Sequence, residues 1–166
     1  MKTAIKSGIL LSTLWLFCCA SENMSSLSET EEEPTEISNS KAAQVTAIEV
    51  TGEENVYTFS VTILSTDAGC EQYADWWEVI DLEGNLLYRR ILGHSHVNEQ
   101  PFTRSGGTIA ISKEQEVYIR AHMNNLGYGD GVLKGSVLMG FTKAELDTKF
   151  ASNLETQAPL PTNCAF

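Results

Sequence analysis

The chain has 166 residues, of which 42% are hydrophobic, and a formal net charge of −11 at pH 7. A chain of this length predicts a single domain, and a small one once removable ends are set aside. Acidic residues outnumber basic ones by 22 to 11, which excludes electrostatic binding to nucleic acid or to anionic lipid. The composition therefore indicates a small acidic domain whose partners are neither nucleic acid nor a bare membrane surface.

Residues 1–20 have the parts of a signal peptide. Two lysines precede an apolar run, Ile9 to Phe17, that is too short to cross a membrane as a helix. The run ends in Leu16-Phe17-Cys18-Cys19, which resembles a bacterial lipobox and implies lipidation of Cys19. Cleavage after Ala20 is the alternative, and it would give a periplasmic or secreted chain. We expect an exported protein, attached to the bacterial outer membrane or cell surface through a lipid in the first case.

Residues 21–43 are rich in Ser, Glu and Thr and almost lack large apolar side chains. Such a segment cannot bury enough surface to offset its conformational entropy, so it is predicted to be disordered. A polar tether after a lipid-bearing cysteine suits a surface-anchored domain. A solvated tail of a secreted protein fits the same composition. The folded domain is expected to span residues 44–166.

The domain is dominated by short segments of alternating polarity. In residues 57–63, Tyr57, Phe59, Val61 and Ile63 alternate with hydroxyl side chains, which predicts a strand with one buried face. Turn-forming residues separate seven such segments. The predicted strands are residues 45–50, 57–63, 74–81, 86–92, 108–112, 117–124 and 132–141.

A short helix is expected to follow the last strand. Thr142 and Glu145 fit a capping box, and Leu146, Phe150 and Leu154 recur at helical spacing. These patterns predict a helix over residues 143–154.

The predicted fold is an all-β antiparallel sandwich of about seven strands with one short C-terminal helix. The order of elements over residues 44–141 resembles an immunoglobulin or fibronectin-type module, with a tryptophan on the third strand. No named family of known function can be attached to it. The resemblance implies that the third strand lies between the fourth and the sixth. Loops 70–73, 94–104 and 124–131 would then share one end, where sandwich proteins often place recognition residues.

Two cysteines, Cys70 and Cys164, lie in the expected domain. In an exported protein such a pair most simply forms a disulfide. Two free thiols in metal or redox chemistry are the alternative, but no ligand-type spacing supports it.

His94-Ser95-His96 is a candidate metal motif, because residues two apart on an extended chain face the same side. His122 emerges at the same end of the expected sandwich, and Glu99 or Asp130 could complete the set. Imidazole and carboxylate ligands suit Zn²⁺ or Cu²⁺. The alternative is that these histidines are ordinary loop residues bonded to backbone or to carboxylates. No cofactor is expected beyond such a metal.

The outer face of the same expected sheet offers a second candidate site. Trp76, Tyr118 and Arg120 are predicted to point outward there, and Arg104 lies in the adjoining loop. Aromatic and charged side chains of this kind could bind a protein, a peptide or a carbohydrate. The alternative is that Glu78 pairs with Arg90 or Arg120 across strands and that the C-terminal helix covers the face.

No arrangement in the sequence indicates catalysis, although the pattern leaves enzyme activity open. A GxSxG elbow is absent, and the glycines of residues 125–131 lack the lysine of a phosphate-binding loop. We therefore expect an exported protein that acts as a binding module through one loop end. Zn²⁺ or Cu²⁺ binding by His94, His96 and His122 is the alternative function.

Overall fold

The computed structural model describes residues 42–165, and they form a domain built almost wholly of β-strands. A short 3-10 turn, η1 (Ser152–Thr156), is the helical element found in this part of the chain. The strands are β1 (Gln44–Thr51), β2 (Tyr57–Leu64), β3 (Ala74–Ile80), β4 (Leu86–Ile91), β5 (Phe102–Ile109), β6 (Val117–Met123), β7 (Gly127–Tyr128), β8 (Gly131–Ser136) and β9 (Gly140–Glu145).

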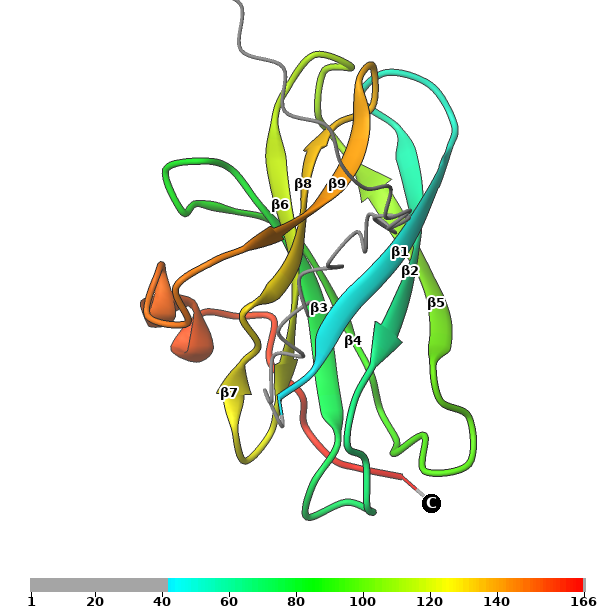
Figure 1. Cartoon of the computed structure of the whole chain (residues 1–166), viewed down its shortest axis with the longest axis vertical. Coiled ribbons are helices and arrows are strands. Elements are labelled where there is room, and N and C mark those ends of the chain that lie inside the picture. The colour runs from blue at the N-terminus through cyan, green and yellow to red at the C-terminus, as the bar shows by residue number, and fades with distance from the viewer. Residues whose placement is uncertain (1–41, 166) are drawn as a thin grey trace, which may run out of the picture. The chain divides into compact units, whose positions relative to one another are not determined.

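The strands form two antiparallel sheets, so the predicted all-β class is confirmed (Figure 1). One sheet has the order β1-β2-β5, and the other has the order β4-β3-β6-β8-β9, with β7 paired to β6. The expected position of the third strand between the fourth and the sixth is confirmed by this order. Inward side chains of both sheets form the main core, which includes Phe59, Trp77 and Ile119.

The expected signal peptide, the lipidation site Cys19 and nearly all of the tether lie outside the described residues. In residues 42–165, no helix is long and apolar enough to cross a membrane.

The strand predicted at residues 108–112 begins six residues earlier, at Phe102, and ends at Ile109. Phe102 pairs with Ile63 and is buried, which starts β5 against β2. On the exposed face, hydroxyl pairs then link the two strands: Thr62 to Thr103 and Ser60 to Ser105, each at 2.8 Å. Polar cross-strand pairs of this kind stabilise a strand that has little apolar alternation of its own.

The prediction of a helix over residues 143–154 is wrong. Residues 140–145 instead form β9, which pairs with β8 along its whole length after a turn at residues 137–139. Pairing with a neighbouring strand outweighs the weak helix preference of Thr142 to Glu145. The expected strand 132–141 is correspondingly a hairpin of two strands.

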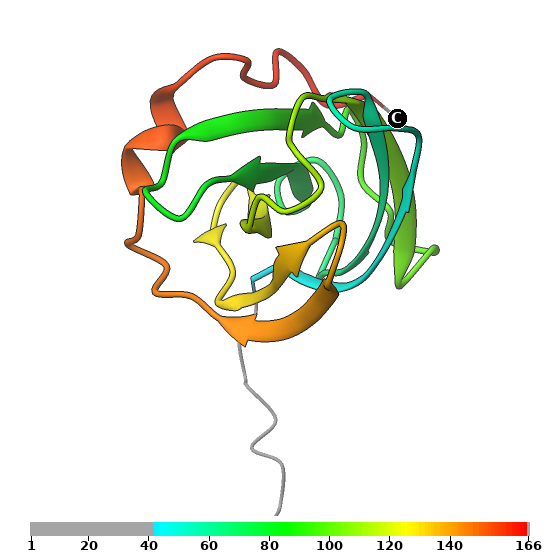
Figure 2. The ribbon, with the colours of Figure 1, turned by 90° about the horizontal axis from the view of Figure 1, so that it is seen from above.

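The apolar residues assigned to that helix still bury together, although most of their segment is irregular. Leu154 is buried, and Leu146 and Phe150 are partly buried, against Trp76 and Ile80 on the outer face of the second sheet. The C-terminal segment, residues 146–165, therefore runs along the outside of β3 and β4 (Figure 2). Its end is fixed by the Cys70–Cys164 disulfide, with the Cα atoms 5.6 Å apart, which confirms the predicted bond.

Candidate functional site

Three loops meet at one end of the domain, as the sequence predicted. They are the β2–β3 loop (residues 65–73), the β4–β5 loop (92–101) and the turn after β6 (124–126). The backbone N–H of Gly69 donates to Ser95 Oγ at 3.2 Å, and Asn124 Nδ2 donates to the Cys70 carbonyl at 2.9 Å. These bonds join all three loops into one surface, which we call the loop end.

Asp67 is the residue that holds this end together, and sequence reasoning missed it. Its carboxylate is buried and accepts bonds from Ser65 Oγ at 2.7 Å, from the Ala74 N–H at 2.9 Å and from the His96 N–H at 2.7 Å. Bonds from several donors offset the cost of burying a charge. No sequence motif marks it, because Asp67 lies in the polar loop before β3 and its partner His96 comes from a distant loop position.

His96 is buried, and its ring stacks on Phe102 with the ring centres 3.8 Å apart. Neither ring nitrogen has a hydrogen-bond partner among residues 42–165; Nδ1 lies 3.7 Å from the Asp67 carboxylate. Burial lowers the pKa of His96 below its ordinary value, and the nearby charges of Arg104 and His94 lower it further. The imidazole is therefore held neutral over a wider pH range than a free histidine.

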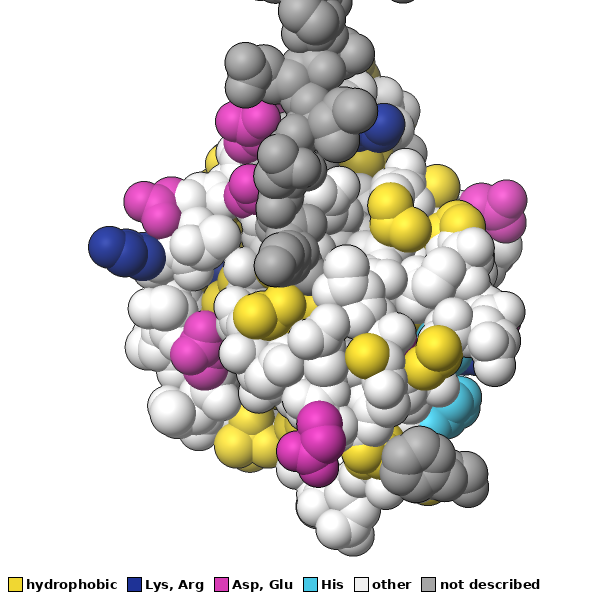
Figure 3. Space-filling view, turned by 60° about the horizontal axis from the view of Figure 1, so that its bottom comes forward, with side chains coloured by type: hydrophobic (Ala, Val, Ile, Leu, Met, Phe, Trp, Pro, Cys, Tyr) yellow, Lys and Arg dark blue, Asp and Glu magenta, His cyan; other side chains and the backbone are white. Residues whose placement is uncertain are grey.

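His94 is exposed beside His96, with their ring centres 4.4 Å apart. The exposed His94 and the buried His96 both line a pocket of about 590 Å³, which we call the His94 pocket. Around it, the loop end shows an imidazole and scattered apolar and acidic side chains (Figure 3). The pocket is lined by Ala68, Gly69, His94, Ser95, His96, Val97, Asn98, Glu99 and Ala165.

Arg104 and Glu99 form an ion pair at the rim of this pocket. Arg104 Nη1 and Nη2 donate to Glu99 Oε1 and Oε2 at 3.0 and 2.8 Å. This pairing lowers the pKa of Glu99 and raises that of Arg104. The predicted ligand-binding residue Arg104 and the predicted metal ligand Glu99 are thus close to the histidine pair but occupied with each other.

His122, the third predicted metal ligand, lies elsewhere. It stacks on Trp76 with ring centres 3.6 Å apart, and its Nδ1 lies 2.7 Å from Asp75. Its Nε2 faces Glu155, at 4.0 Å, under the C-terminal segment. Within residues 42–165, no group of three or more His, Cys, Asp or Glu side chains is placed to hold a metal ion. The predicted four-residue set is therefore not assembled.

The outer face predicted to bind a ligand is covered by the C-terminal segment. Trp76 and Arg120 are only 3% and 1% exposed, and Tyr118 is partly buried against Phe150. These three residues do not form an open binding surface, because the segment that follows β9 packs over them. The alternative interpretation describes this face better: Glu78 pairs with arginines across strands, and the C-terminal segment covers them.

The centre of the covered face is a buried triad of two arginines and a glutamate. Glu78 receives bonds from Arg89 Nε and Arg120 Nε, both at 2.8 Å. The arginines then reach outward to the C-terminal segment: Arg120 donates to the Phe150 and Ala151 carbonyls, and Arg89 to those of Leu154, Gln157 and Pro159. Arg120 was expected as a partner of Glu78, whereas Arg89 takes the place expected for Arg90.

The chain is similar to a curated protein of Halomicrobium mukohataei named "Putative lipoprotein", with 36% identity over 121 residues. The matched part covers 70% of this chain and 59% of that protein, so the chain corresponds to little more than half the length of this relative. No protein-family model matches the chain. No solved structure matches it either.

Proposed function

We propose that this chain is an exported, lipid-anchored β-sandwich protein that binds a polar ligand in the His94 pocket. The observation that carries the proposal is the pocket itself. Its walls come from loops that hydrogen bonds and the Asp67 carboxylate hold in place, so the groups that line it are preorganised. Imidazole, hydroxyl, carboxamide and carboxylate groups stand side by side there, and they suit a hydroxyl- or amide-rich ligand, a carbohydrate or a peptide.

The test of binding uses glycan and peptide arrays probed with the purified protein. We expect His94→Ala and Asn98→Ala to lose the signals that the wild type gives, because both side chains line the pocket. Glu71→Ala is the matched control, since Glu71 is exposed on a neighbouring loop and does not line the pocket. Array signals that are equal in the wild type and both pocket variants would refute the proposal.

Support for the lipid anchor comes from the lipobox-like residues 16–19 and from the name of the similar Halomicrobium protein. The anchor is tested by mass spectrometry of the mature N-terminus and by fractionation of cells. We expect the wild type in the membrane fraction and Cys19→Ala in the soluble fraction. Cys18→Ala should remain anchored, because Cys18 precedes the residue that would carry the lipid. A soluble wild type that begins at Ser21 would exclude the anchor.

Metal binding by His94 and His96 is a second candidate, favoured by the buried and unpartnered ring of His96. A Zn²⁺ ion about 2 Å from one nitrogen of each ring, at a tetrahedral angle, would hold the ring centres roughly 5 Å apart. Their separation of 4.4 Å is shorter, so binding requires a small shift of the exposed His94 ring. A neutral imidazole is the form that binds metal, and the lowered pKa of His96 favours it. The remaining ligands would be water, or Glu99 after it leaves Arg104.

Calorimetric titration with Zn²⁺ and Cu²⁺ tests this candidate. We expect uptake of about one equivalent by the wild type, with affinity strongly reduced in His94→Ala and in His96→Ala. His122→Gln is the control, because His122 stacks on Trp76 away from the pair. Titrations that do not change in either pair variant would exclude the site.

We also infer that the sandwich is of the immunoglobulin or fibronectin type. Its first, second and fifth strands share one sheet, and its third, fourth and sixth share the other, which is the arrangement such modules use. Modules of this type commonly bind ligands through the loops at one end, which agrees with the position proposed for the pocket.

A further inference from the structure

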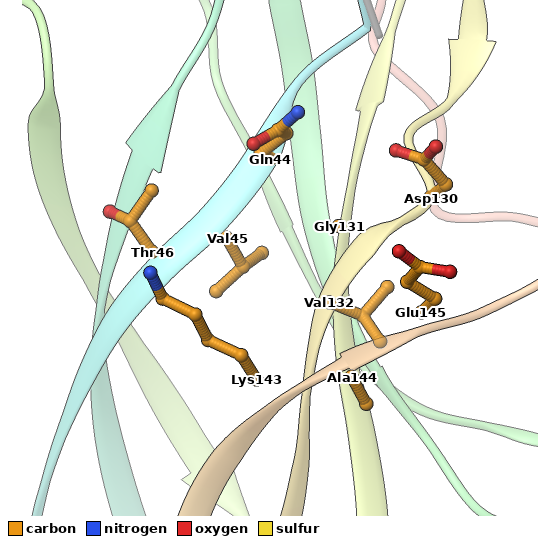
Figure 4. Close-up of a pocket in the computed structure, with 9 residues that line it drawn as sticks. All are labelled: Gln44, Val45, Thr46, Asp130, Gly131, Val132, Lys143, Ala144 and Glu145. Atoms are coloured by element: carbon orange, nitrogen blue, oxygen red, sulfur yellow. The ribbon is translucent and has the colours of Figure 1, made fainter. Parts of the chain in front are cut away.

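The sandwich has an open side between β1 and β9. These strands are the outer strands of their sheets, and two adjoining pockets of about 360 and 530 Å³ lie between them. The pockets share Thr46 and Lys143, so they form one continuous depression, which we call the β1–β9 groove. Figure 4 shows the half of it that lies nearer the loop end.

Within residues 42–165, both strands that border the groove have one backbone edge without a paired strand. Among residues 42–165, β1 is paired with β2 alone and β9 with β8 alone. The N–H and C=O groups on the other edge of each strand therefore have no strand partner in this part of the chain. Such an edge is a template for an added strand, which gains main-chain hydrogen bonds regardless of its sequence.

The walls of the groove are mostly apolar and only partly buried. Ile48 and Val50 project from β1, and Val137 and Phe141 belong to the β8–β9 hairpin. Phe141 packs edge-on against Phe59 of the core, with ring centres 5.8 Å apart, so the floor of the groove is continuous with the core. Apolar side chains of an added strand would bury these half-exposed surfaces.

Lys143 is an exposed, charged residue of β9 that lines both pockets of the groove. It pairs across β9 and β8 with Leu133, a core residue, so its side chain leaves the sheet on the inner face. In Figure 4 it reaches across toward Thr46 on β1. No ion pair found in residues 42–165 includes Lys143. The acidic side chains that share its pocket, Asp130 and Glu145, line the end nearer the loops.

An inward-pointing charge on an edge strand decides which strands can be added. A purely apolar strand would bury the ammonium group without a partner, which is costly. A strand that places a carboxylate opposite Lys143 replaces this cost with a charge-assisted hydrogen bond. Lys143 would therefore both reject ordinary strands and select acidic ones.

We propose that the β1–β9 groove docks an extended peptide segment of a partner protein as an added strand. The segment has alternating apolar side chains and one Asp or Glu that meets Lys143. This docking site is separate from the His94 pocket and does not depend on it, because the two share no lining residue.

A library of random nonapeptides displayed on phage, selected on the immobilised full chain, tests the proposal. The selected peptides should share alternating apolar residues and one acidic position. Binding of a synthetic selected peptide, measured by fluorescence anisotropy, should weaken about tenfold or more in Lys143→Ala and further in Lys143→Glu. Thr46→Trp, which narrows both pockets, should weaken it too. Lys149→Glu, the same charge change at an exposed site outside the groove, should leave binding as in the wild type.

A charge swap separates direct contact from a general charge effect. A peptide in which Lys replaces the acidic residue should have a higher affinity for the Lys143→Glu variant than for the wild-type protein. Amide exchange in residues 44–51 or 140–145 should slow when peptide is bound, because one of these edges gains a partner. Selection that yields no acidic preference, equal effects of Lys143→Glu and Lys149→Glu, or unchanged exchange in both strands would each overturn the proposal.

Discussion

His96 is held in place by ring contacts and by a hydrogen bond of its backbone N–H, and its ring nitrogens make no hydrogen bond within residues 42–165. The ring is sandwiched between Phe102 and His94, and the His96 N–H is bound to Asp67. Protonation would place a charge in this apolar stack, with the Asp67 carboxylate 3.7 Å away as partial compensation. His96 is therefore a point where acid should weaken the loop end.

The pH dependence of stability tests this. The pKa of His96 is lowered in the folded chain, so near and below the unfolded value of about 6.5 the unfolded chain binds more protons. Stability is then fully present above that value and is lost as pH falls through it toward the folded value. We expect the wild type to lose more stability between pH 7 and pH 5 than His96→Phe does, as measured by urea unfolding. Parallel curves for the two proteins would contradict this, since other groups cancel in the difference.

Asp67 gives a second prediction for a single residue. Asp67→Ala leaves the Ala74 and His96 N–H groups and the Ser65 hydroxyl without their acceptor in a buried place. Unsatisfied buried donors cost about 1–3 kcal/mol each, so for these three donors we expect a loss of about 3 kcal/mol or more in the free energy of unfolding. Asp81→Ala is the control, because Asp81 also accepts backbone bonds but lies in an exposed turn. Equal losses in the two variants would mean that Asp67 is an ordinary turn residue.

Among the elements, those with strict alternation could be predicted from the sequence. The sequences of β2 and β6 alternate with a period of two. Burial alternates in the same way along β2, whereas β6 is buried along nearly its whole length. β5 was placed too late, because its contacts are hydroxyl pairs with β2 that leave no apolar pattern. β9 was mistaken for a helix, because Thr142 to Glu145 satisfies a local capping rule that its pairing with β8 overrides.

The same contrast applies to the candidate site. The meeting of three loops followed from strand order alone, and the His94–His96 pair lies where that order placed it. The position of His122 did not follow, because β6 places its side chain on the outer face of the sheet, beneath a C-terminal segment that the sequence presented as a helix. The triad at Glu78 depended on cross-strand register, which the sequence left open between neighbouring arginines.

The triad supports a prediction about the second sheet. Glu78→Gln removes the charge that both Arg89 and Arg120 face, and all three side chains are at most 1% exposed. Breaking a buried ion pair leaves uncompensated charge, so we expect a loss of about 3–5 kcal/mol in the free energy of unfolding by urea. Glu99→Gln is the control, because its pair with Arg104 is exposed and should change stability little. A small effect at Glu78 would mean that the arginines are held by the C-terminal carbonyls alone.

At the scale of the whole molecule, the C-terminal segment closes the second sheet and returns to the loop end. The arginines of the triad bind its backbone, Leu154 fills the apolar cluster, and Cys164 is bonded to Cys70. The Ala165 N–H also donates to the Gly93 carbonyl at 2.7 Å, beside the His94 pocket. The C-terminal segment therefore connects the covered face to the pocket. Among residues 42–165, the Cys70–Cys164 disulfide is the one covalent cross-link that holds it there.

Reduction of that bond should loosen the segment and destabilise the whole domain. The bond joins cysteines 94 positions apart. The chain-entropy model assigns closure of such a loop about 4.6 kcal/mol, and measured values are more often about 2–4 kcal/mol. We expect a reductant to lower the Tm of the wild type and to speed amide exchange over residues 146–165. In Cys164→Ser the Tm should already be low, and the reductant should not lower it further. If the reductant lowers the Tm of both proteins equally, its effect does not come from this bond; if the wild type does not respond, the arginine contacts alone hold the segment.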